Sequence, residues 1–153
     1  EHGAPRFFRR LAEGVFDVED LHRRPEELGD FVEAAAERYA FASGQLYAVG
    51  FSNGANVAAS LLLTRPSLLN GGVLIRAMVP FEPASQPALA GREVLLSQGM
   101  SDPIVPRAQG ERLAELFRSA GASVELAWQV GGHGLVNGDL VVARRWLGER
   151  LSG

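Results

Sequence analysis

Short, continuously apolar runs recur along the chain from residue 46 onward. They occupy residues 46–51, 72–75 and 94–97. Runs of this length without polar alternation predict strands that are covered on both faces of a parallel sheet. A fourth segment, residues 123–130, alternates apolar with polar positions. That alternation predicts a strand with one wetter face, placed at an edge of the sheet.

Amphipathic segments lie between and beyond the predicted strands. Residues 53–64 are rich in alanine and leucine, and residues 107–120 and 139–151 repeat apolar positions at helical spacing. An earlier helix is expected to open at Pro25. Its apolar stripe would consist of Leu28, Phe31, Val32, Ala35 and Tyr39. No strand is expected before residue 46.

Alternation of strands with helices predicts an α/β fold. The short connections favour right-handed crossovers, which produce an open parallel sheet with helices on both faces. We expect a single domain over residues 1–153, because this length suits one domain of ordinary size. Ligands of such sheets bind beyond the carboxyl ends of the strands, so polar residues at those ends are the candidates for function.

A serine follows the first predicted strand. The chain there reads Gly50-Phe51-Ser52-Asn53-Gly54, a G-x-S-x-G pattern between a strand and a helix. This context is typical of a nucleophile elbow, where a serine stands at a sharp turn. We expect both glycines to be needed, because side chains there would make the strand and the helix collide. The alternative is a glycine-rich turn with an idle serine.

A serine nucleophile needs a base, because its hydroxyl is weakly nucleophilic at neutral pH. The chain has three histidines. His133 stands between glycines directly after the edge strand, whereas His2 is at the chain start and His22 lies among charged residues. We therefore expect His133 to be the base, with a loop histidine that has no partner as the alternative.

The base in turn needs a carboxylate that holds its tautomer. Asp102 follows the third predicted strand and precedes Pro103. Asp139 is closer to His133 in sequence, but it stands where the last helix should begin and is interpreted as an N-cap. Asp102 is therefore the expected acid, and the alternative for it is a turn-forming role before proline.

These residues occur in the order Ser52, Asp102, His133, each after a different strand, which is the order of α/β-hydrolases. The chain resembles α/β-hydrolase-fold serine esterases. More narrowly, it resembles the bacterial carboxylesterase/phospholipase family, relatives of dienelactone hydrolases and acyl-protein thioesterases. The resemblance rests on VGFSNGAN at 49–56, GMSDPIVP at 99–106 and GGHGL at 131–135, and it covers nearly the whole chain.

The resemblance implies roles for particular residues. Ser52 would be the nucleophile, Asp102 the orienting acid and His133 the general base. The backbone N–H of Asn53 would donate to the oxyanion. The segment after the second predicted strand, residues 76–81, would line the substrate pocket through Met78 and Phe81, unless these two side chains belong to the core.

The implied reaction is hydrolysis of small carboxylic esters or thioesters through an acyl-enzyme, without a cofactor. Members of the family are longer, and their additional strands and a second oxyanion donor come first in the chain. We therefore expect this chain to be the carboxyl-terminal portion of a hydrolase that lacks its N-terminal strands. A complementing N-terminal segment or a homodimer would then cover the elbow strand. The alternative function is a non-catalytic remnant module used in binding or assembly.

Composition narrows the expected partners. A net charge of −3 argues against nucleic-acid binding, and 46% apolar with 22% charged residues is typical of a soluble globular domain. The absence of cysteine excludes disulfides and thiolate metal sites and favours the cytosol, and we expect no metal site. No apolar run approaches the roughly 18–20 residues of a membrane span, so none is expected.

Overall fold

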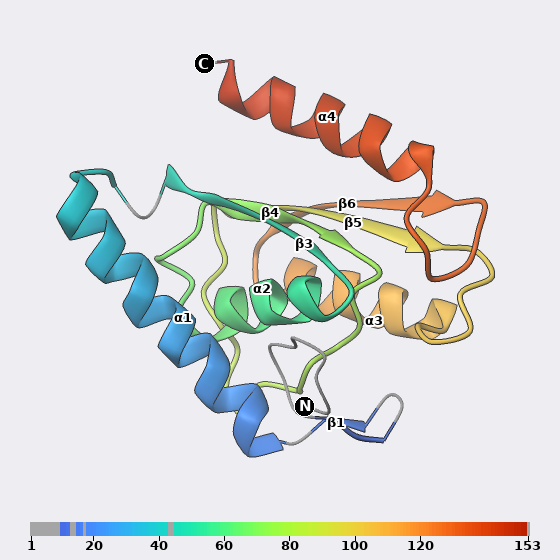
Figure 1. The fold of residues 1–153 in the computed structure, drawn as a ribbon, viewed down its shortest axis with the longest axis horizontal. Coiled ribbons are helices and arrows are strands. Elements are labelled where there is room, and N and C mark those ends of the chain that lie inside the picture. Colours follow the sequence, from blue (N-terminus) through green and yellow to red (C-terminus); the bar gives the residue numbers. More distant parts are fainter. Residues whose placement is uncertain (1–9, 13–14, 17, 43–44, 153) are drawn as a thin grey trace, which may run out of the picture.

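A four-stranded parallel sheet forms the centre of the molecule. The computed structural model describes residues 10–12, 15–16, 18–42 and 45–152 (Figure 1). The strand order is β3-β4-β5-β6, and every neighbouring pair is parallel. The strands are β3 (Tyr47–Phe51), β4 (Gly71–Ile75), β5 (Glu93–Gly99) and β6 (Ser123–Gln129). Each coincides to within about two residues with a segment that the apolar pattern predicts, and β6 lies at an edge, as expected.

Helices cover both faces of this sheet, which confirms the predicted architecture. Helices α2 (Asn53–Thr64) and α3 (Arg107–Ser119) lie on one face, and α4 (Asn137–Leu151) lies on the other (Figure 1). Helix α1 (Val18–Tyr39) packs against α2, to which it is linked by ion pairs of Arg65 with Asp30 and Glu33.

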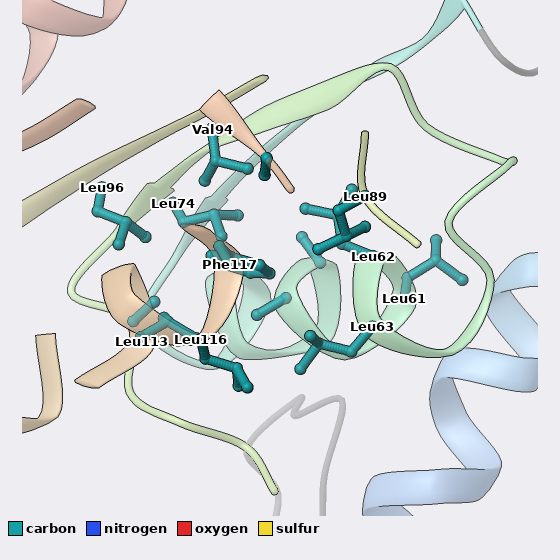
Figure 2. Close-up of a cluster of buried hydrophobic side chains, with 14 of the residues drawn as sticks. Leu61, Leu62, Leu63, Leu74, Leu89, Val94, Leu96, Leu113, Leu116 and Phe117 are labelled. Atoms are coloured by element: carbon teal, nitrogen blue, oxygen red, sulfur yellow. The ribbon is translucent and has the colours of Figure 1, made fainter. Parts of the chain in front are cut away.

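Two hydrophobic cores, one on each side of the sheet, explain why the predicted strands are continuously apolar. In β4, Leu74 points into the larger core beneath α2 and α3, whereas Val73 and Ile75 pack on the α4 side with Trp146. Figure 2 shows the larger core, in which leucines of α2 and α3 meet the strand residues and Phe117. Since both faces are buried, neither face of β4 has polar positions.

The N-terminal part differs from the prediction in two ways. Two short strands, β1 (Arg10–Ala12) and β2 (Val15–Phe16), form an antiparallel pair separate from the main sheet, so the expectation of no strand before residue 46 is wrong. Strands this short contain no readable alternation. Helix α1 begins at Val18, and Pro25 lies inside it rather than at its start, although an internal proline removes a hydrogen bond of the helix.

The predicted stripe of α1 is buried only in part. Leu28, Val32 and Ala35 are half-buried, whereas 69% of Phe31 and 73% of Tyr39 are exposed. An apolar cleft lies between α1, α2 and the outer side of β3. Its lining is Leu28, Val32, Leu46, Tyr47, Ala48, Val49, Gly54, Val57, Ala58, Leu61 and Leu69. We call it the β3 cleft.

The cleft borders an open edge of the sheet. Within the described residues β3 pairs with β4 and with no second strand, and Val49 on that edge is 62% exposed. None of the helices in the described part of the chain is long and apolar enough to cross a membrane.

Candidate active site

Ser52 stands at a strained turn between β3 and α2. Its φ of 52° and ψ of −113° lie outside the regions that residues with a side chain usually occupy. The turn is fixed on both sides, because the Ser52 N–H donates to the carbonyl of Ile75 in β4 and the Ser52 carbonyl accepts the N–H of Asn56 in α2. Strain held by the surrounding structure is typical of functional positions, and this turn has the local geometry of a nucleophile elbow.

The two glycines of the motif are not equivalent. A Cβ on Gly50 would lie 2.6 Å from the backbone of Gly54 and Ala55, so any side chain there would collide with the start of α2. A Cβ on Gly54 would meet nothing within 4 Å. The sequence prediction that both positions must lack a side chain is therefore right for Gly50 and wrong for Gly54, which lines the β3 cleft.

The structure brings Ser52, His133 and Asp102 together in one hydrogen-bonded chain. The Ser52 Oγ is 2.8 Å from the His133 Nε2, and the His133 Nδ1 is 2.8 Å from the Asp102 Oδ2. A carboxylate can only accept, so the His133 proton sits on Nδ1 and Nε2 accepts the serine hydroxyl proton. Residues separated by 81 and 31 positions in sequence thus meet at the carboxyl ends of three strands.

The Asp102 carboxylate is held by a turn of its own. Its side chain is fully buried, and its Oδ1 accepts the N–H groups of Ile104 and Val105 at 2.8 and 3.0 Å. Burial acts to raise the pKa of Asp102, but the hydrogen bonds from Val105, His133 and Ile104 outweigh it and hold the pKa below its usual range. Asp102 therefore faces His133 as a carboxylate.

His133 stands in a loop that rests on the end of β5. The N–H groups of Met100 and Ser101 donate to the carbonyls of Gln129 and Gly131, and a Cβ on Gly99 would lie 2.4 Å from the carbonyl oxygen of Gly132. The loop therefore needs the glycine of β5 to approach this closely. The ring of Phe51, next to the serine, lies 5.5 Å from the imidazole between centroids.

Asp139 takes a different place from the predicted one. Helix α4 begins at Asn137, so Asp139 lies inside its first turn, and the N-cap is Val136. The Asp139 carboxylate still caps the helix, because it accepts the Val136 N–H at 2.9 Å. The Asp139 side chain is fully buried and pairs with Arg76. The carboxylate that His133 Nδ1 bonds to is that of Asp102. The N-cap interpretation is therefore wrong in position, since a capping carboxylate can also reach back from inside the first turn.

The segment after β4 contains Met78 and Phe81. Phe81 is half-buried and packs against the larger core, as the alternative interpretation had it. The Met78 N–H donates to the Asn56 Oδ1 at 3.0 Å, which ties the segment to α2 one turn after Ser52. Asn56 is a residue that the sequence analysis missed. A polar side chain in an apolar helix, here 2% exposed, requires a partner, and that is the signal that could have found it.

Asn53 is the first residue of α2, so its N–H has no acceptor within the helix. The positive end of the helix dipole lies at the same place, which favours a negative charge beside Ser52. In the described part of the chain no cluster of three histidine, aspartate or glutamate side chains is arranged to hold a metal ion. His2, the histidine at the chain start, lies outside the described residues.

Known proteins resemble this chain in sequence and in fold. The profile of the phospholipase/carboxylesterase family matches residues 15–147. This chain belongs to that family. It is 44% identical over 151 residues to MhqD, a putative hydrolase of Bacillus subtilis (strain 168), in a match that covers 99% of the chain and 76% of MhqD.

Solved structures of family members have the same fold. The crystal structure of the Bacillus cereus carboxylesterase superposes with a TM-score of 0.94 at 44% identity, covering 98% of this chain and 71% of that one. A carboxylesterase from Mesorhizobium loti gives a TM-score of 0.88 at 26% identity, covering 96% and 70%. The α/β-hydrolase resemblance seen in the sequence is thereby confirmed, and hydrolase is the activity class of the family.

Proposed function

We propose that this hydrolase-family protein is a serine esterase that cleaves small carboxylic esters or thioesters through an acyl-enzyme. The supporting observation is the chain of hydrogen bonds Ser52–His133–Asp102, with both donor–acceptor distances at 2.8 Å and the serine on a strained turn. The name of the Bacillus cereus relative, a carboxylesterase, supports the same substrate class.

The reaction follows from the direction of these hydrogen bonds. Ser52 Oγ attacks the ester carbonyl carbon while its proton passes to His133 Nε2, and Asp102 stabilises the imidazolium that forms. The imidazolium then protonates the leaving alcohol or thiol, which departs with the electrons of its bond to the acyl carbon. Water, deprotonated by His133, attacks the acyl-enzyme and releases the carboxylic acid, and the proton returns to Ser52 Oγ.

The oxyanion of each tetrahedral intermediate would lie at the N-terminus of α2. We assign the Asn53 N–H as one donor, because it is free of intrahelical bonds and directly follows the nucleophile. One such donor contributes roughly 2.7–4 kcal/mol of transition-state stabilisation in serine hydrolases. We further assign Met78, held beside α2 by Asn56, to the substrate pocket.

The non-catalytic alternative is not favoured by this geometry. A module kept only for binding would need neither a strained serine nor a buried carboxylate aligned on the imidazole, yet both are present. A cytosolic location, and a homodimer or N-terminal segment that completes the fold, remain predictions.

Reaction of the protein with a fluorophosphonate tests the proposal, because this reagent labels activated serines. We expect a single adduct, mapped by peptide mass spectrometry to Ser52, and turnover of p-nitrophenyl acetate that is lost in Ser52→Ala. Ser123→Ala is the matched control, since this exposed serine begins β6 and lies at the opposite end of that strand from the loop that carries His133. Labelling of another serine, or undiminished hydrolysis in Ser52→Ala, would refute the assignment.

A further inference from the structure

Arg76 is a charged residue in an unusual place. It directly follows β4, is fully buried, and has a φ of 56° in the left-handed region that residues with a side chain rarely adopt. A strained backbone position persists only where the surrounding structure holds it in place, and such positions cluster at functional sites.

All five N–H groups of the guanidinium have an acceptor. Two donate to the Asp139 carboxylate, Nη1 at 2.8 Å and Nη2 at 3.0 Å, in the bidentate geometry that arginine favours. Nη1 also donates to the Ser97 carbonyl at 3.1 Å. The other two donate to backbone carbonyls of the histidine loop, Nε to Gly132 at 2.9 Å and Nη2 to Gly134 at 3.2 Å.

Gly132 and Gly134 are the residues immediately before and after His133. One rigid, planar group therefore fixes the backbone on both sides of the imidazole. This is needed because the loop is glycine-rich and has little side-chain packing of its own to hold it.

Asp139 fixes the far end of the same loop. Its carboxylate accepts the Val136 N–H, the Ser97 Oγ at 2.6 Å and both guanidinium nitrogens. Ser97 belongs to β5, the strand that leads to Asp102, so the ion pair is attached to the same strand that positions the acid. The loop is thus held to the sheet between β4, β5 and the start of α4.

A buried ion pair of this kind is a poor device for stability. Its desolvation cost is comparable to its Coulombic gain, and apolar replacements are often no less stable. An apolar side chain could not donate the hydrogen bonds that Arg76 makes to the carbonyls on both sides of His133.

We propose that Arg76, supported by Asp139, is a positioning residue that aligns His133 between Ser52 and Asp102. This rests on the proposed serine hydrolase function. Arg76 itself contacts neither the nucleophile nor the acid, and it acts through the carbonyl groups of Gly132 and Gly134.

Arg76→Lys tests the proposal, because lysine keeps the charge beside Asp139 but lacks the planar fork that reaches both carbonyls. We expect kcat to fall by about 10²-fold, the effect of misplacing a catalytic group by roughly 1 Å, with KM changed less than about twofold. Fluorophosphonate labelling of Ser52 should slow by the same factor.

A general loss of stability is controlled by Leu113→Ala. Leu113 is fully buried in α3 on the opposite face of the sheet, so this variant lowers the melting temperature without touching the loop. We expect its kcat to stay within about twofold of the parent at a temperature where both are folded. If Arg76→Lys loses no more kcat than Leu113→Ala does, the positioning role is wrong.

Nitrogen-15 NMR of the imidazole gives a readout that does not depend on activity. In the parent protein, His133 is expected to be a single tautomer with its proton on Nδ1, and in Arg76→Lys a mixture of tautomers. Ser97→Ala, which removes one hydrogen bond to Asp139, should shift both readouts in the same direction by less, and it serves if Arg76→Lys does not fold. Absent labelling of the parent protein would refute the esterase proposal, and an unchanged tautomer in both variants would refute the role of Arg76.

Discussion

Replacing Asp102 by asparagine changes one atom of the carboxyl group and separates its structural from its catalytic role. The Oδ1 atom accepts two backbone N–H groups, from Ile104 and Val105, and the Oδ2 atom faces His133. The asparagine oxygen is expected to stay with the two backbone donors, because an amide NH₂ there would oppose two N–H groups. The new NH₂ group must then face the His133 Nδ1.

This orientation reverses the imidazole. Nδ1 has to accept the amide proton, so the ring proton moves to Nε2, which then donates toward Ser52 and cannot accept its hydroxyl proton. Loss of the correct tautomer lowers kcat by about 10³–10⁴ in serine hydrolases with this chain of residues. That factor corresponds to about 4–5.5 kcal/mol of activation free energy.

Steady-state hydrolysis of p-nitrophenyl acetate, with circular dichroism as a check of folding, measures the effect. KM should change little, because Asp102 lies behind His133 and does not touch the substrate. Asp139→Asn is the matched control, being the other buried carboxylate close to the loop. It should cost less in kcat and more in melting temperature, since it leaves the Arg76 charge unpaired. A kcat for Asp102→Asn within tenfold of the parent would refute the assignment of the acid.

Three further outcomes are expected from the same geometry. The pKa of Asp102 is lowered on folding, so its contribution to stability is present above the ordinary aspartate value of about 3.9 and is lost as pH falls through the lower folded-state value. In urea unfolding, the difference in unfolding free energy between the parent and Asp102→Asn should therefore narrow from about pH 5 to pH 2. Gly50→Ala should abolish folding or fluorophosphonate labelling, because its Cβ would lie 2.6 Å from backbone atoms, whereas Gly54→Ala should fold normally and gain up to about 1 kcal/mol of helix stability. Equal behaviour of the two variants would contradict the close approach of β3 and α2 at this turn. Val49→Lys on the open edge of β3 should reduce concentration-dependent self-association in light scattering, with Leu140→Lys on the exposed face of α4 as control.

Local features of the sequence are sufficient to predict the four strands of the main sheet, most helices and the turn at Ser52. Each of these depends on neighbours within a few positions. The apolar runs predict strands covered on both faces, and the collision that excludes a side chain at Gly50 involves residues only four and five positions away. The order of Ser52, Asp102 and His133 also indicates that the three side chains share one edge of a parallel sheet, because every parallel strand ends on the same side.

The tertiary structure decides what depends on distant parts of the chain. The sequence favours Asp102 over Asp139 because Asp102 follows a strand, but the contact between Asp102 Oδ2 and His133 Nδ1 forms only when the folded loop brings the two side chains together. Gly54 is expected from the sequence to be needed for close packing, yet it faces the open β3 cleft, and which side of α2 is covered is not a local property.

Arg76 shows the limit most clearly. An arginine after a strand is indistinguishable, in sequence, from one that extends into solvent. Its acceptors lie 21 to 63 positions further along the chain, on β5, the histidine loop and α4. The physical reason is that a buried charge is tolerated only where several acceptors converge. The order of the strands and the crossover connections between them bring these acceptors together.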